Sequence, residues 1–165
     1  TEVVEGFEEV FTSTHGKLVV AAFSSSIYRM QILVDLAAQF DRKVAFVGRS
    51  VVRNAEIAQR LGYLRIPSGV QIRDSDVPNY SSEDVLCVTT GSQGEPQAAL
   101  SRIAIDDHRF VKLGPDDVVV IQCADLLSDE SAKRIHASLK QIFPPGTRIA
   151  ILDGGMTMKI ARKEP

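Results

Sequence analysis

An unbroken apolar run that stops at a polar, glycine-punctuated turn constrains this chain more than any other feature: Val85-Leu86-Cys87-Val88 leads into Thr89-Thr90-Gly91-Ser92-Gln93-Gly94. The run holds β-branched and small apolar residues without alternation, which is typical of a parallel strand covered on both faces. Open α/β sheets collect their ligands outside the carboxyl ends of such strands. We therefore expect a buried strand that delivers a loop to a ligand-binding edge.

The loop after this strand is suited to an anion. Its small residues, Thr90, Gly91, Ser92, Gln93 and Gly94, can present several backbone N–H groups to a phosphate. The alternative is a tight connection between a strand and a helix that binds no ligand. The loop alone does not separate the two.

Strand-like runs alternate with segments of helical period along the chain, as in βαβ units that feed a parallel sheet. The predicted fold class is α/β: a three-layer, Rossmann-like domain with a mainly parallel sheet flanked by helices, as a single domain over residues 1–165. Further strands are expected at 17–22, 43–47, 118–123 and 148–152, with a short one at 110–113. Residues 156–160 are expected to form either a hairpin partner or the start of a tail.

Composition limits the partners and the compartment. A formal charge of -2 provides no global basic surface, so any contact with nucleic acid must come from a local patch or a partner domain. Cys87 and Cys123 both lie in apolar runs, which favours buried thiols over a disulfide. No run is long enough to span a bilayer and no signal peptide is evident, so we expect no membrane partner and a cytoplasmic location. The first residue is threonine, which suggests an excised or processed fragment.

Three loops share the same character, because each follows a strand and opens a helix. Helix N-termini, serine hydroxyls and arginines are groups that hold a sugar-phosphate chain. The candidate phosphate-binding or RNA-binding residues are therefore Ser24, Ser25, Ser26, Arg29, Gly48, Arg49, Ser50, Thr90, Gly91, Ser92, Gln93 and Gly94. The alternative is that the serines, Ser50 among them, only cap helices while the arginines snorkel or pair with acids.

Four segments, in this order, resemble the β-CASP domain of bacterial ribonuclease J. They are Ala21-Ala22-Phe23-Ser24-Ser25-Ser26-Ile27-Tyr28-Arg29-Met30-Gln31, Val44-Ala45-Phe46-Val47-Gly48-Arg49-Ser50, Leu61-Gly62-Tyr63-Leu64, and Thr89-Thr90-Gly91-Ser92-Gln93-Gly94-Glu95-Pro96 with Ala99-Leu100-Ser101-Arg102. The resemblance spans about residues 3–120, and the ending at 121–165 departs from it.

The resemblance implies an α/β insert in a metallo-β-lactamase fold, with RNA lying in the cleft between two lobes beside a di-zinc centre. It also implies 5′-to-3′ exonucleolytic and endonucleolytic RNA cleavage by the whole enzyme, with a preference for 5′-monophosphate ends. His15, His108 and His136 have no metal-ligand spacing, so we expect no cofactor in this chain and zinc only in a missing lactamase lobe.

Three functions stay open from the sequence. The first is a β-CASP-like lobe, catalytically silent alone, that holds RNA with a 5′-monophosphate end when joined to a lactamase lobe. The second is a Rossmann-like module for a nucleotide or another phosphate ligand, although no Gly-Xaa-Gly-Xaa-Xaa-Gly follows a strand. The third is a structural or interaction domain, either a fragment or a chimera, without activity of its own. A homo-oligomer is compatible with all three.

Overall fold

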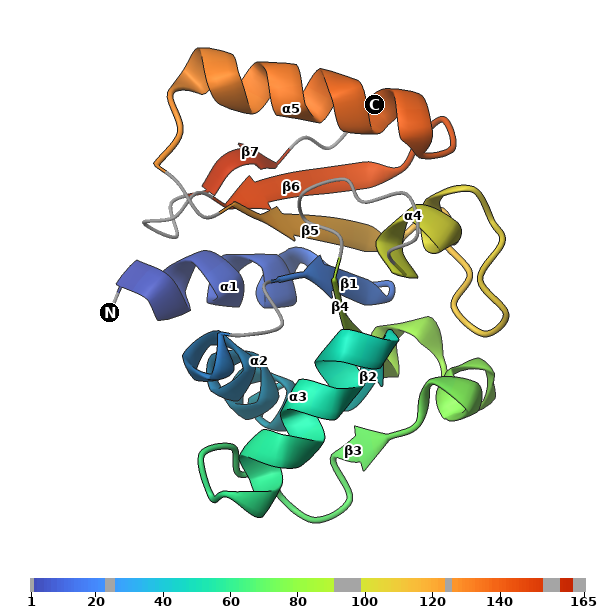
Figure 1. Cartoon of the computed structure of the whole chain (residues 1–165). Helices are drawn as coiled ribbons and strands as arrows, with labels where there is room; N and C mark the ends of the chain where they lie inside the picture. Colours follow the sequence, from blue (N-terminus) through green and yellow to red (C-terminus); the bar gives the residue numbers. More distant parts are fainter. Residues whose placement is uncertain (1, 23–25, 91–98, 124–125, 153–157, 162–165) are drawn as a thin grey trace.

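The chain is organised around one seven-stranded sheet. A computed structural model describes residues 2–22, 26–90, 99–123, 126–152 and 158–161 (Figure 1). The strands lie in the order β3-β2-β4-β1-β5-β6-β7, and all pairs are parallel except β6 with β7. Their bounds are β1 Leu18–Ala21, β2 Lys43–Val47, β3 Gln71–Ile72, β4 Val85–Thr89, β5 Val118–Gln122, β6 Arg148–Leu152 and β7 Met158–Ala161.

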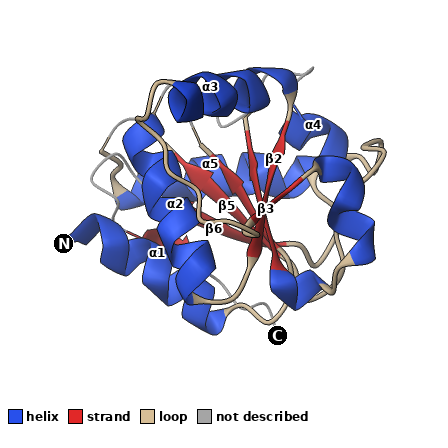
Figure 2. Ribbon diagram, turned by 90° about the horizontal axis from the view of Figure 1, so that it is seen from below, coloured by secondary structure: helices blue, strands red, loops and turns tan. Residues whose placement is uncertain are grey.

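Helices cover both faces of the sheet (Figure 2). One face carries α1 Glu2–Ser13, α2 Ile27–Gln39 and α3 Arg49–Arg60, and the opposite face carries α4 Ala99–Ala104 and α5 Asp129–Ile142. Two short 3-10 helices, η1 Asp74–Asn79 and η2 Ser82–Asp84, lie between β3 and β4. The predicted α/β fold, with helices on both sides of a mainly parallel sheet, is confirmed.

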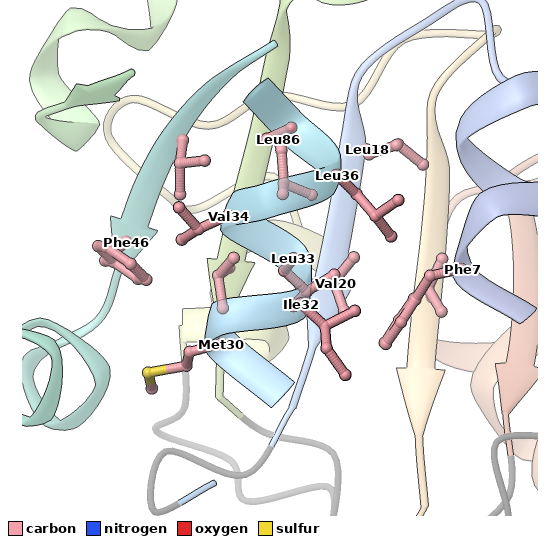
Figure 3. Packing of buried hydrophobic residues seen from close by; sticks show 14 of the residues in the cluster. Phe7, Leu18, Val20, Met30, Ile32, Leu33, Val34, Leu36, Phe46 and Leu86 are labelled. Carbon is pink, nitrogen blue, oxygen red and sulfur yellow. The ribbon is translucent and has the colours of Figure 1, made fainter. Parts of the chain in front are cut away.

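The core beneath α2 shows how the sequence pattern produces this layering (Figure 3). Met30, Leu33 and Val34 recur at helical spacing and are buried. They pack in the same cluster as Leu18 and Val20, which alternate along β1. The intervening β1 residue, Val19, belongs to the cluster on the opposite face, so the central strand is apolar on both sides.

The amino ends of the central strands are held by one buried arginine. The Arg42 side chain is 4% exposed, and its guanidinium donates to the carbonyl oxygens of Thr14, Gly16 and Val85 at 2.9, 2.8 and 3.0 Å. Burial lowers the pKa of Arg42, while the acidic side chains of Asp84 and others oppose that shift. These bonds tie the residues before β1 to the start of β4.

Some local expectations need correction. Residues 110–113 form no strand; the backbone N–H groups of Phe110 and Val111 donate to the His108 ring instead. Of the two options for the last segment, the hairpin partner is correct, because β7 pairs antiparallel with β6. Within the described ranges, no helix is long and apolar enough to cross a bilayer.

Candidate phosphate-binding edge

Four strands end at the same level, which brings their exit loops to one edge of the sheet. Ala21 of β1 pairs with Thr89 of β4 and with Ile121 of β5, and Thr89 also pairs with Val47 of β2. Neighbouring strands lie about 4.8 Å apart. The residues that follow these strands therefore form a short continuous row, as the sequence predicts for a parallel sheet.

The chain diverges twice along this edge. From β2 the chain continues toward β3, whereas from the neighbouring strand β4 it continues in the opposite direction toward β5. The neighbours β1 and β5 diverge in the same way, because the chain leaves β1 toward β2 and leaves β5 toward β6. Ligands in open α/β sheets bind at such points, because the connecting segments part and leave a crevice. Both places contain residues from the predicted set.

At the first divergence, the N-terminus of α3 meets the end of β4. Gly48 is the N-cap residue, has φ of 113°, and lies so close that an added Cβ would approach Thr90 Oγ1 at 3.6 Å. Gly48 has no side chain to cap the first turn, which contains Arg49 and Ser50, and no other side chain among the described residues bonds to the N–H groups of that turn. The prediction that Ser50 caps this helix is therefore wrong: Gly48 occupies the cap, because the chain needs a positive φ there. The uncapped turn leaves the positive end of the helix dipole open to an anion.

These residues line an open groove of about 990 Å³, here called the β2/β4 groove. Four of its lining residues come from the predicted set: Gly48, Arg49, Ser50 and Thr90. The rest of the lining is Val52, Asp74, Ala99, Arg102, Ile105, Asp107 and His108. The groove thus combines cations, carboxylates, hydroxyl groups and apolar side chains.

At the second divergence, Arg29 from the first turn of α2 reaches the end of β5. With the Gln122 amide oriented so that its oxygen faces the guanidinium, Arg29 Nε and Nη1 donate to that oxygen at 2.6 and 2.8 Å. Gln122 is fully buried, so it holds the guanidinium in one place at the sheet edge. A positioned guanidinium keeps further N–H groups for a bidentate contact with phosphate.

The predicted residues thus fall into four groups. The β2/β4 groove gathers Gly48, Arg49, Ser50 and Thr90, whereas Arg29 lies at the other divergence beside β5. Ser26 is the N-cap residue of α2, but its side chain makes no capping hydrogen bond. Ser24, Ser25, Gly91, Ser92, Gln93 and Gly94 lie outside the described residues.

Sequence reasoning missed two side chains at this edge. The sequence pattern considered His108 only as a metal ligand. His108 follows α4, the helix after β4, and that position lets it line the β2/β4 groove. Gln122 ends an apolar strand, and a lone amide in that position was a signal that a partner would be needed.

A metal site does not fit the described residues. Across residues 2–22, 26–90, 99–123, 126–152 and 158–161, His, Cys, Asp and Glu form no group of three or more that could hold an ion. The His108 Nδ1 atom is occupied by two backbone N–H donors. The donor set of the di-zinc centre that the resemblance implies is therefore not assembled by these residues.

Comparison with known proteins identifies the family of this chain. The family model described as "Ribonuclease J, beta-CASP domain" matches residues 15–136. Ribonuclease J of Helicobacter pylori (strain J99) is 35% identical over 148 residues, which is 90% of this chain and 21% of that protein. Ribonuclease J of Corynebacterium glutamicum is 42% identical over 116 residues, which is 70% of this chain and 16% of that protein.

The matches also correct the extent of the resemblance. The family model begins at residue 15 and runs past residue 120 to residue 136, into α5. The chain spans about a fifth of the length of these relatives, 21% of the Helicobacter protein and 16% of the Corynebacterium protein. With the family model covering most of its length, the chain belongs to the ribonuclease J β-CASP domain family.

Proposed function

We propose that this domain holds the sugar-phosphate backbone of RNA at the carboxyl edge of its sheet, as one lobe of a ribonuclease J-like RNA-processing enzyme. The observation that carries the proposal is the β2/β4 groove, where the uncapped N-terminus of α3, Arg49 and Thr90 converge. Helix N-termini and arginines are the groups that bind phosphate without reading base sequence.

The second divergence extends the proposed contact along the edge. Arg29 is fixed by Gln122 at the end of β5, and the β1 and β4 strand ends lie between it and the groove. Two arginines on one edge, Arg29 and Arg49, supply local positive charge that the net charge of -2 conceals. An RNA strand crossing this edge can meet both.

The complete activity is part of the same proposal. The relatives are named ribonuclease J, and this chain matches about a fifth of their length, 21% for the Helicobacter protein. We infer that this domain positions RNA with a 5′-monophosphate end, while a metallo-β-lactamase lobe carries the zinc and the hydrolysis. A cytoplasmic setting fits the buried Cys87 thiol, which is in no disulfide. A homo-oligomer stays a prediction.

The experiment is a titration of the chain with a short single-stranded RNA carrying a 5′-monophosphate, at several salt concentrations. Binding should weaken as salt rises, with a slope of about -0.7 per phosphate neutralised. Arg49→Ala should weaken binding for all base sequences and reduce that slope, because one phosphate contact is lost.

Arg53→Ala is the matched control. Arg53 is exposed on the same helix but does not line the groove, so its removal tests charge without position. Equal losses for Arg49→Ala and Arg53→Ala would show that only diffuse charge attracts RNA. No binding of the wild-type chain at low salt would refute RNA holding by this domain alone.

A further inference from the structure

His108 is the only buried polar side chain among the residues described along the β2/β4 groove, with 6% of its surface exposed. Its Nδ1 atom accepts hydrogen bonds from the backbone N–H groups of Phe110 and Val111 at 3.2 and 3.1 Å. For Nε2, no hydrogen-bond partner is found in the part of the chain that the structure describes. The Nε2 atom keeps access to solvent, so it is the open end of an otherwise buried ring in the wall of the groove, where a ligand atom can reach it.

The hydrogen bonds fix the state of this ring. Since Nδ1 accepts from two N–H groups it carries no proton, and the neutral ring then bears its hydrogen on Nε2. Burial lowers the pKa of His108, and the charges of Arg102 and Lys112 lower it further, while Asp74 opposes them. The groove therefore contains a fixed, uncharged N–H donor at neutral pH.

The remaining lining selects among phosphate-bearing ligands. Arg49 and Arg102 contribute positive charge, but the carboxylates of Asp74 and Asp107 line the same groove. A free phosphate ion would meet both signs, whereas a nucleotide carries a phosphate at one end and hydroxyl or amino donors at the other.

The apolar part of the lining supports the same choice. Val52 and Ile105 line the groove with 37% and 66% of their surface exposed. Exposed aliphatic side chains next to polar groups provide a surface on which the face of a base can pack. The volume of about 990 Å³ leaves room for one nucleotide with its base.

We infer that the β2/β4 groove is a subsite for a single ribonucleotide of the RNA, in which His108 Nε2–H donates to an oxygen of the sugar-phosphate. The inference rests on the proposed RNA-holding function and adds a base-accommodating position and a neutral donor to it.

His108→Asn separates the donor from the structural role of the ring. The Asn Oδ1 atom can replace Nδ1 as the acceptor for Phe110 and Val111, but nothing replaces Nε2–H. We expect the unfolding midpoint of this variant to stay close to wild type. RNA affinity should fall about tenfold, the effect of one hydrogen bond to a charged group. The salt slope should not change, because a neutral donor displaces no counterion.

His108→Ala is the comparison variant, because it removes both the acceptor and the donor. It should lose stability as well as affinity. Wild-type RNA affinity in His108→Asn would overturn the inference and leave the broader RNA-holding proposal standing.

A second measurement does not depend on RNA binding or on a folded variant. The ring nitrogen signals of His108 are followed by NMR during titration of the wild-type chain with AMP or with inorganic phosphate. AMP should shift the Nε2–H signal, and inorganic phosphate at the same concentration should shift it less. Such a shift without RNA binding would keep the nucleotide subsite and refute RNA holding. No shift with AMP, or an equal shift with inorganic phosphate, would overturn the ribonucleotide subsite.

Discussion

The Asp117 carboxylate accepts a hydrogen bond from the backbone N–H of Lys17 at 2.7 Å, across 100 residues of sequence. Its second oxygen accepts from Gly114 N–H at 2.7 Å and lies 3.7 Å from the Lys17 ammonium. That ammonium donates in turn to the Lys112 carbonyl at 2.6 Å. One buried acid thus joins the starts of β1 and β5, at the edge opposite the proposed binding residues.

Asp117→Asn should destabilise the fold by roughly 2 to 3 kcal/mol, because the amide keeps one acceptor and turns its NH₂ group toward a backbone donor. Urea unfolding measures the loss. Asp116→Asn is the control, since Asp116 is exposed and adjacent, and it should change stability by less than about 0.5 kcal/mol. Equal stability of the two variants would contradict a clamping role for Asp117.

Gly48→Ala should cost more than Gly62→Ala, although both glycines have positive φ angles, of 113° and 80°. An alanine at 62 has nothing within 4 Å and incurs only backbone strain of about 1 kcal/mol. At 48 the added Cβ would also lie 3.3 Å from the Ala99 Cβ, so we expect a total loss of about 2 kcal/mol.

The same pair of variants tests the groove. Gly48→Ala should also weaken RNA binding, because it pushes α3 away from α4, whereas Gly62→Ala should leave binding intact. Chemical denaturation and the RNA titration together check both statements. A larger stability loss at position 62 than at 48 would show that the close packing around Gly48 is not what constrains it.

Cys87 should make stability depend on alkaline pH. Burial raises the pKa of Cys87 from 9.0 to about 12, so the folded chain holds this proton more tightly than the unfolded chain does. The stability that the protonated Cys87 thiol contributes to the fold is complete below pH 9 and is lost as the pH rises from about 9 to about 12.

The measurement compares wild type with Cys87→Ala at pH 8 and pH 10. Wild type should lose about 1 kcal/mol more than the variant over this interval, because only its unfolded state releases the thiol proton. Parallel losses would show that the Cys87 thiol ionises alike in both states.

Arg29→Ala should weaken RNA binding regardless of base sequence and lower its salt dependence. Arg29→Lys should restore charge but not the paired donation to Gln122, so its affinity should lie between those of wild type and the alanine variant. Arg60→Ala, an exposed site in the last turn of α3, controls for net charge. Unchanged affinity and slope for Arg29→Ala would remove Arg29 from the binding edge.

The sheet and its polarity could be predicted because local signals agreed with the tertiary fold. The runs at β2, β4, β5 and β6 are apolar without alternation. Gly62, which has a positive φ, follows α3 and marks its end. The strand expected at 110–113 was wrong because an apolar pattern did not reveal the His108 ring as a competing acceptor for its N–H groups.

The site was predictable only up to the strand ends. Because parallel strands end together, the sequence could place twelve residues from three loops at one edge, and Gly48, Arg49, Ser50 and Thr90 of that set line one groove. The contribution of His108 and the Arg29 to Gln122 contact depend on how segments far apart in sequence pack. No local sequence pattern predicts either the role of His108 or the contact of Arg29 with Gln122.

The two edge strands of the sheet, β3 and β7, limit how this domain can associate with another protein domain. β3 has two residues and β7 has four, so within the described residues neither flank offers a long row of unpaired backbone groups to an incoming strand. Extension of the sheet into a neighbour is disfavoured on both sides. We expect any companion lobe or second copy to dock through helix surfaces and loops, which leaves the backbone hydrogen bonds of the sheet untouched.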